Sequence, residues 1–210
     1  MPCRTLPRRA WALKARVDGA AVGDRTSQNT VESMRRGGWI RISLLALGLL
    51  AASGGPPVGA EPRQATFLKT FRDWNLYVAR DDVGKICYIA SEPVEKDGNY
   101  RRRGATAVVV AKFPDPKLGI QVSVQAGYPY KKKSNVQMTI DKKRYELFTD
   151  GENAFAFTAE DDRKIIEAMK RGRRMVVKGT SRKGTYSIDT YSLMGFSAAY
   201  RAMLDECKNP

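Results

Sequence analysis

The sequence of 210 residues contains no histidine and only three cysteines. Histidine is the side chain most often used as a general base near neutral pH and as a metal ligand, so catalytic and metal sites that depend on it are excluded. Long apolar runs are also scarce. The run at 42–52 covers 11 residues, and a helix of that length spans about 17 Å, well short of the roughly 30 Å hydrocarbon core of a bilayer.

What the chain does contain is enough apolar material for a core, together with an excess of positive charge. Hydrophobic residues make up 42% of the chain, including 9 Tyr, 7 Phe and 3 Trp, which excludes a disordered polyelectrolyte. Lys and Arg number 37 against 22 Asp and Glu, so the formal charge is +15. The sequence therefore predicts a basic globular protein with a packed interior.

Residues 34–60 have the pattern of a secretory signal peptide. Arg35, Arg36 and Arg41 precede the apolar run at 42–52, and Val58-Gly59-Ala60 supplies the small residues that signal peptidase needs. We expect cleavage after Ala60 and no transmembrane segment in the mature chain. A retained membrane anchor is the alternative.

A signal peptide belongs at the N-terminus, whereas this one begins at Met34. Residues 1–33 are rich in Arg, Ala, Gly, Ser and Thr and show no sustained apolar period. We interpret them as an extension upstream of a true translation start at Met34; an organelle transit peptide is the alternative. Secretion undiminished in a Met34→Leu variant would refute the first reading. The remaining residues, 61–210, are expected to form a single domain.

Two cysteines, Cys87 and Cys207, remain in the expected mature chain, since Cys3 lies upstream of the cleavage site. Export places them in a compartment where disulfides persist, and two cysteines allow one intramolecular pairing. We therefore expect a Cys87–Cys207 bond. Two separate buried thiols remain an alternative, and a metal site is disfavoured because two cysteines without histidine do not complete a tetrahedral zinc shell.

Nine short stretches of the mature chain carry strand-like patterns after a loose lead-in at 61–70. The run 105–112 is nearly continuous in β-branched residues, as expected of a strand covered on both faces, whereas 120–126 alternates and places Ile120, Val122 and Val124 on one face. Short strands at this spacing are typical of an antiparallel sandwich or barrel. The predicted strands are 74–79, 86–90, 105–112, 120–126, 136–140, 144–148, 153–157, 174–178 and 186–191.

Two helices are expected in addition to the strands. The first begins after Thr158, a good N-cap, and ends at Gly172, with acidic residues in its first turn and basic residues in its last. The second covers about 196–207, where apolar residues recur at helical spacing and Cys207 lies on the same face as the apolar side chains. The first helix is thus inserted between strands and the second is C-terminal.

Dispersed sequence blocks in a fixed order resemble the invasion associated locus B family of secreted bacterial proteins. The blocks are FRDWNLY, KICYIASEP, VSVQAGYPYKKKS, LFTDG, MVVKGTS and DTYSLMGF, followed by a final EC, and the resemblance covers 67–208. It implies an immunoglobulin-like antiparallel β-sandwich in the periplasm or outer membrane of a Gram-negative bacterium, or secreted from it. The positions of Cys87 and Cys207 match the two cysteines of one branch of the family, which implies one bridge. The family name derives from host-cell invasion, and the family has no established catalytic residues.

No residue pattern points firmly to catalysis. Without histidine, a nucleophile such as Ser181 would need Lys178 or Lys183 as its base, and a Gly-rich loop between strands explains that segment equally simply. We therefore expect a non-enzymatic protein with no catalytic residues, no metal and no cofactor, and keep a histidine-free hydrolase as the third reading.

The basic charge is the stronger functional signal. Three triplets are candidates for binding polyanions, and Tyr100, Tyr128 and Tyr130 flank two of them. Because export makes nucleic acid inaccessible, we expect lipopolysaccharide, anionic lipid or host sulfated glycans as partners. Alternatives are a protein-docking module of the envelope and a solvated surface without a ligand. The candidate residues are Arg101, Arg102, Arg103, Lys131, Lys132, Lys133, Lys142, Lys143 and Arg144.

Overall fold

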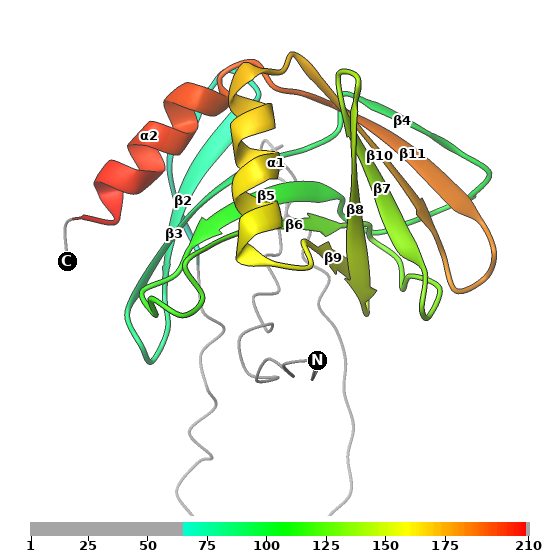
Figure 1. Ribbon diagram of the computed structural model, residues 1–210, viewed down its shortest axis with the longest axis horizontal. Coiled ribbons are helices and arrows are strands. Elements are labelled where there is room, and N and C mark those ends of the chain that lie inside the picture. The colour runs from blue at the N-terminus through cyan, green and yellow to red at the C-terminus, as the bar shows by residue number, and fades with distance from the viewer. Residues whose placement is uncertain (1–64, 209–210) are drawn as a thin grey trace, which may run out of the picture. The chain divides into compact units, whose positions relative to one another are not determined.

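The computed structural model describes residues 65–208, which form a mainly antiparallel β fold with two helices (Figure 1). The helices are α1 (Ala159–Arg171) and α2 (Phe196–Glu206). The strands are β1 (Thr66–Phe71), β2 (Trp74–Arg80), β3 (Lys85–Ser91), β4 (Glu95–Gly98), β5 (Ala107–Lys112), β6 (Ile120–Gln125), β7 (Asn135–Ile140), β8 (Lys143–Asp150), β9 (Asn153–Phe155), β10 (Arg174–Thr180) and β11 (Tyr186–Ser192).

All these strands belong to one antiparallel sheet in the order β1-β2-β3-β5-β6-β9-β8-β7-β10-β11-β4. The sheet has two arms, β1-β2-β3-β5-β6 and β8-β7-β10-β11-β4, and β9 pairs with β6 on one side and β8 on the other. Side chains from both arms enter one core cluster, which is how the two layers of a sandwich are packed. The predicted antiparallel β class with an inserted and a C-terminal helix is confirmed.

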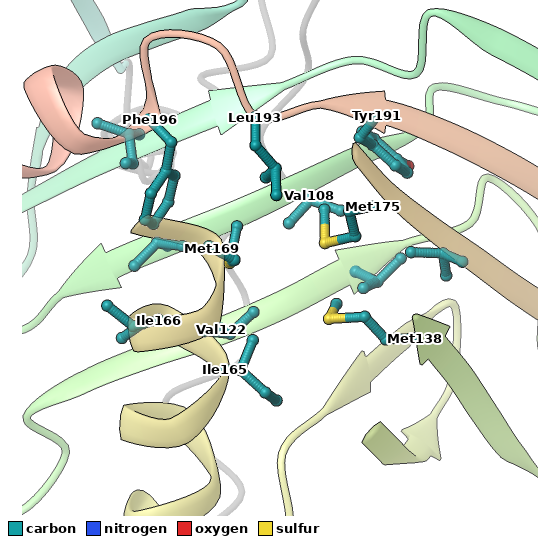
Figure 2. Close-up of a cluster of buried hydrophobic side chains, with 14 of the residues drawn as sticks. Val108, Val122, Met138, Ile165, Ile166, Met169, Met175, Tyr191, Leu193 and Phe196 are labelled. Atoms are coloured by element: carbon teal, nitrogen blue, oxygen red, sulfur yellow. The ribbon is translucent and has the colours of Figure 1, made fainter. Parts of the chain in front are cut away.

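The core lies between the two arms of the sheet and the two helices. Met138 and Met175 come from one arm, Val108 and Val122 from the other, and Ile165 from α1, and all five are fully buried (Figure 2). Both helices therefore cover the same face of the sheet. Burying one such side chain stabilises a fold by about 1.5–3 kcal/mol, so this cluster is the principal source of stability.

β5 is covered on both faces, as its nearly continuous β-branched run predicts. Val108 and Val110 point into the main core, while Val109 and Ala111 pack against a second, smaller cluster around Tyr88. The alternating strand β6 also behaves as predicted, because Val122 and Val124 are buried in the main core. Periodicity of the sequence thus predicts the face that each central strand presents.

α1 has the predicted caps at both ends. The hydroxyl of Thr158 accepts a hydrogen bond from the backbone N–H of Asp161 at 3.1 Å, and the N–H of Gly172 donates to the carbonyl of Ala168 at 2.8 Å. Gly172 has φ −80°, so the chain needs no left-handed residue there. It needs a small one, because a Cβ atom would lie 2.7 Å from Cγ2 of Ile140.

α2 packs on β2 and β3 through its apolar face. Phe196 meets Trp74 edge to face, with ring centroids 4.9 Å apart, and Trp74 donates its indole N–H to the carbonyl of Ser192 at 3.1 Å. Met203 is fully buried on the same side of the helix. The predicted range of about 196–207 is correct apart from Cys207, which caps the helix instead of lying inside it.

Two strands have no counterpart among the predicted ones. β1 lies in the segment expected to be a loose lead-in, and β4 lies between the predicted strands 86–90 and 105–112. They occupy the two ends of the sheet, and their side chains are mostly exposed. An edge strand with exposed side chains has no reason to alternate in hydrophobicity, which is why the pattern missed both.

The extension at 1–33, the signal peptide at 34–60 and its cleavage site lie outside the described residues and stay predictions. Within 65–208, neither helix has the length and hydropathy needed to cross a bilayer.

Candidate functional site: a basic end of the sheet

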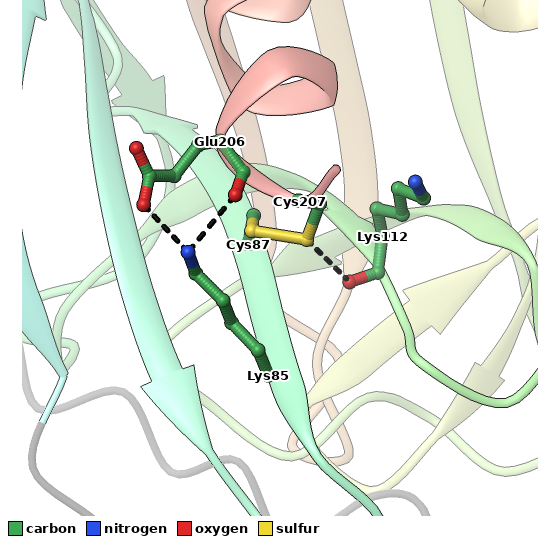
Figure 3. Close-up of a disulfide and its surroundings, with 5 residues drawn as sticks. All are labelled: Lys85, Cys87, Lys112, Glu206 and Cys207. Carbon is green, nitrogen blue, oxygen red and sulfur yellow. Dashed lines mark hydrogen bonds and ion pairs between the residues drawn. A yellow bond between two sulfur atoms is a disulfide. The ribbon is translucent and has the colours of Figure 1, made fainter. Parts of the chain in front are cut away.

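The sulfurs of Cys87 and Cys207 are bonded and join β3 to the end of α2 (Figure 3). The Cα atoms are 5.8 Å apart and the residues are 120 positions apart in sequence. An ion pair lies beside the bond, since Nζ of Lys85 is 2.7 Å from Oε1 of Glu206 and 2.9 Å from the carbonyl oxygen of the same residue. The expected pairing is thus present, and α2 is fixed to the sheet covalently and by charge.

Two of the three predicted basic triplets lie at the same end of the sheet. The loop before β7 carries Lys131–Lys133, and the N–H of Lys131 donates to Thr180 at the end of β10 at 2.9 Å. The loop after β4 carries Arg101 and Arg102, and the N–H of Gly104 in that loop donates to Gly127, at the start of the loop before β7, at 2.8 Å. Backbone hydrogen bonds therefore hold the segments of Arg101, Arg102 and Lys131–Lys133 at the same end of the sheet.

The turn between β10 and β11 adds two more cations to this end. Arg182 and Lys183 are exposed, and the N–H of Arg182 donates to the carbonyl of Pro129 at 2.8 Å. In Figure 1 this turn and the loop entering β7 lie next to each other at the lower right. We call this surface the basic loop end; it consists of Arg101, Arg102, Lys131, Lys132, Lys133, Arg182 and Lys183.

The cations of the basic loop end are exposed, and among residues 65–208 none of them has an ion pair or a side-chain hydrogen bond. Asp150 and Glu152 flank Gly151, whose carbonyl accepts the N–H of Tyr130 at 2.8 Å, and exposed Asp97 stands four positions before Arg101 in the chain. The seven cations outnumber these three carboxylates. A surface of this kind attracts anions, and the attraction is screened by salt.

Arg103 does not belong to this surface, which corrects its assignment as a polyanion-binding candidate. Its guanidinium donates through both terminal nitrogens to the two carboxylate oxygens of Asp189 on β11, and the two side chains are 4% and 3% exposed. The first two arginines of the triplet point to solvent, whereas the third is used inside the protein.

The Arg103–Asp189 pair is surrounded by aromatic and hydroxyl groups. The guanidinium carbon of Arg103 lies 4.5 Å from the ring centroid of Tyr100. The hydroxyl of Ser187 donates a hydrogen bond to the carboxylate of Asp189 at 3.4 Å and forms a second one, 2.7 Å long, with the hydroxyl of Tyr128. Burial lowers the pKa of Arg103, but the hydrogen bond and charge of Asp189 outweigh it, so the net pKa is raised. Arg103 stays charged and anchors the loop that displays Arg101 and Arg102.

The third triplet lies elsewhere. Lys142, Lys143 and Arg144 are exposed at the turn between β7 and β8, at the opposite end of β7 from Lys131–Lys133. The six residues of β7 separate the two groups, a distance of about 20 Å at 3.3–3.4 Å per residue. A single compact ligand therefore does not reach both.

The segment considered for a histidine-free hydrolase has the contacts of a turn. The hydroxyl of Ser181 bonds that of Thr185 at 2.6 Å and accepts the backbone N–H of Lys183 at 3.2 Å. Nζ of Lys178 lies over the ring of Tyr186, 5.6 Å from its centroid. Among residues 65–208, neither the Lys178 nor the Lys183 side chain forms a hydrogen bond with Ser181. The described contacts therefore position no base for this hydroxyl.

Among the described residues no group of three or more Cys, Asp or Glu side chains is arranged to hold a metal ion. The buried carboxyl of Asp162 is instead used in the fold. It accepts the backbone N–H of Val122 on β6 at 2.7 Å, just beyond the part of β6 that pairs with β9. Burial raises its pKa to about 7, although the hydrogen bond from Val122 acts in the opposite direction.

Sequence reasoning missed Arg182 and Lys183 as part of the basic surface. They form a pair and not a triplet, and they stand about 50 positions after Lys131–Lys133. The only signal that could have found them is the turn pattern Gly-Thr-Ser-Arg-Lys-Gly between two strands, which places both side chains on an exposed hairpin tip.

Three comparisons relate the chain to known proteins, and the family model carries the assignment. A crystal structure of invasion associated protein B from Bartonella henselae is 17% identical, has a TM-score of 0.49, and the match covers 67% of this chain and 98% of that one. No curated protein sequence matches the chain. The family described as Invasion associated locus B (IalB) protein matches residues 74–204, which include every described element from β2 to β11 and most of α2. The chain belongs to the invasion associated locus B family.

Proposed function

We propose that this protein is a non-enzymatic, exported envelope protein whose basic loop end binds polyanions of the cell surface. The single observation that carries the proposal is that seven exposed cations from three loops lie together without ion-pair partners among residues 65–208. Family membership supports the envelope as the compartment. A role in contact with host cells is consistent with the description of the family and rests on the same surface.

The architecture supports this reading because the loops are held in place before a ligand arrives. The Arg103–Asp189 pair fixes the loop after β4, and the bridge between Tyr130 and Ser181 fixes the loop before β7 against the turn after β10. A preorganised surface loses less conformational freedom on binding than a flexible one. Phosphate and sulfate groups are the partners that such a surface selects, through charge-assisted hydrogen bonds.

Binding of the purified chain to immobilised lipopolysaccharide and to heparin tests the proposal. Affinity is expected to fall by about tenfold or more between 50 and 300 mM salt, because binding by charge releases counterions. At low salt, the K131E/K132E/K133E variant is expected to lose most of the binding that the native chain shows. The matched control, R80E/K117E/R201E, makes the same change in net charge at exposed, scattered positions and is expected to retain it.

Equal loss in the scattered control, or retention that ignores salt and the triple reversal, would overturn the proposal. Circular dichroism and thermal unfolding of each variant show whether the fold is intact. Fractionation of the native organism tests the compartment separately: a cytosolic protein with Cys87 and Cys207 both open to alkylation would contradict export.

A second function, docking to an envelope protein, is favoured by one specific observation. β1 lies at an end of the sheet and exposes Phe67 and Leu68, with exposed fractions of 53% and 41%. An edge strand with apolar side chains is a template for strand addition by a partner. Cross-linking in the envelope distinguishes the two functions, because a defined protein partner that is retained at high salt supports docking.

A further inference from the structure

A groove of about 660 Å³ runs between α1 and the hairpin of β7 and β8. It is lined on one side by α1 from Glu160 onward and its C-cap Gly172, and on the other by the hairpin from Ile140 to Tyr145. Figure 1 shows α1 beside β8 along this line. It is distinct from the basic loop end, because the β7–β8 turn lies at the other end of β7. None of the functions considered above uses this groove.

Both rims of the groove carry positive charge. The hairpin rim presents Lys142 and Lys143, which are exposed and have no ion-pair partner within 65–208. The helix rim presents Arg163, Lys164 and Arg171. An anionic ligand in the groove would therefore meet cations from both sides.

The three acids at the groove are already engaged. Glu160 pairs with both Arg163 and Lys164, and Glu167 is 2.7 Å from Lys170 and 3.6 Å from Arg171. Each of these carboxylates serves two cations, and the pairs are largely exposed to solvent, where they contribute little.

The third acid, Asp141, is engaged by the backbone. One of its carboxylate oxygens accepts the N–H groups of Arg173 and Arg174, at 3.3 and 3.2 Å. Among the lining residues, five lysine or arginine side chains outnumber three carboxylates. The excess lies on the hairpin rim, because Asp161 also stands 3.9 Å from Lys164 on the helix rim.

The length of the groove fits an extended peptide. The floor contains Tyr145 and Ala168, and Ile140 beside them is 3% exposed. The helical rim from Glu160 to Gly172 is about 18 Å long at 1.5 Å per residue, which matches five or six extended residues. Successive side chains of an extended peptide point to opposite sides, so consecutive acidic residues reach the two rims alternately.

We infer that this groove binds an acidic segment of a partner protein in an extended conformation. The carboxylates lie against Lys142 and Lys143 on one side and against Lys164 and Arg171 on the other, and the backbone passes over Tyr145 and Ala168. The inference does not depend on polyanion binding at the basic loop end, since the two surfaces share no residue.

Fluorescein-labelled hexaglutamate is the probe, and hexaglutamine is its uncharged control. Anisotropy at low salt is measured in the K131E/K132E/K133E background, which removes binding at the basic loop end. We expect hexaglutamate, and not hexaglutamine, to bind in this background. K142Q/K143Q and K164Q/R171Q are each expected to weaken binding by about tenfold or more, as the loss of charge-assisted hydrogen bonds predicts.

A charge-neutral variant separates the groove from general attraction. Ala168→Leu fills the floor without changing any charge. It is expected to weaken hexaglutamate binding in this background, and as a single change in the native chain to leave heparin binding unchanged. Thermal unfolding reports whether each variant is folded. If Ala168→Leu does not fold, the K142Q/K143Q variant, whose changes lie on the exposed turn, still tests the inference.

Several results would overturn the inference. These are no binding of hexaglutamate in the K131E/K132E/K133E background, equal binding of hexaglutamine, or no effect of the groove variants. Binding of phosphatidylglycerol vesicles that is lost in K142Q/K143Q, with no hexaglutamate binding, would assign the groove to a membrane surface instead. Failure of heparin binding alone would contradict the proposed function and leave this inference standing.

Discussion

The guanidinium of Arg103 and the carboxylate of Asp189 face each other through two hydrogen bonds, and solvent reaches almost none of either side chain. Breaking a buried pair by removing one partner leaves an uncompensated charge, so Arg103→Ala is expected to lower the free energy of unfolding by about 3–5 kcal/mol. Urea unfolding measures the loss. The R103M/D189L double variant, which removes both charges, is expected to recover most of it. A loss below about 1 kcal/mol in the single variant contradicts the burial of this pair.

The disulfide is expected to contribute about 2–4 kcal/mol to stability. It joins residues 120 positions apart, so reduction frees a long loop in the unfolded chain. Unfolding in urea with and without reductant measures the effect in the native chain. In the C87S/C207S variant the reductant is expected to change nothing. An unchanged unfolding midpoint of the reduced native chain would count against a bond between these residues.

Asp162 predicts a pH dependence of stability. Burial raises its pKa in the folded state to about 7, from the ordinary aspartate value of 3.8, so the folded state binds the proton more tightly than the unfolded one. The favourable contribution is complete below about pH 4 and falls as the pH rises to about 7, by up to roughly 4 kcal/mol. Asp162→Asn is expected to flatten this part of the curve.

Urea unfolding between pH 4 and 8 measures that difference. Asp205→Asn is a suitable control, because Asp205 is exposed on α2 with 70% of its side chain in solvent. Its pH profile is expected to follow that of the native chain. A parallel profile for Asp162→Asn would show that this carboxyl titrates normally in the fold.

Gly172 is expected to reject any side chain. A Cβ atom there would lie 2.7 Å from Ile140 and 2.9 Å from Leu193, so Gly172→Ala is expected to destabilise the protein by about 1–3 kcal/mol through overpacking. Thermal or urea unfolding measures the change. The control is Gly104→Ala, where the nearest atom to a Cβ is 3.4 Å away. Equal effects at the two positions would contradict the steric explanation.

The sequence predicts the central strands and the helices well because their side chains are buried periodically. Val122 and Val124 alternate along β6, and α1 shows both its caps in the sequence. The edge strands β1 and β4 could not be found this way, because one exposes nearly all its side chains and the other carries charged ones. Pairing with a neighbouring strand, and not burial, makes them strands.

The candidate site was predictable only in part. Charge runs identify Lys131–Lys133, but the register that brings Arg182 beside them depends on contacts between distant segments. Nothing local distinguishes Arg103 from Arg102, since the difference is the position of Asp189, 86 residues later. Local sequence gives the kind of side chain, while its exposure and neighbours come from tertiary pairing.

Within the described residues, β9 is the only strand that pairs with both arms of the sheet, and it is three residues long. A seam this narrow supplies few backbone bonds, so the arms are held together mainly by the apolar side chains between them. We therefore expect local opening to begin at this seam, with amide hydrogens of β9 exchanging with solvent sooner than those of β5 and β10.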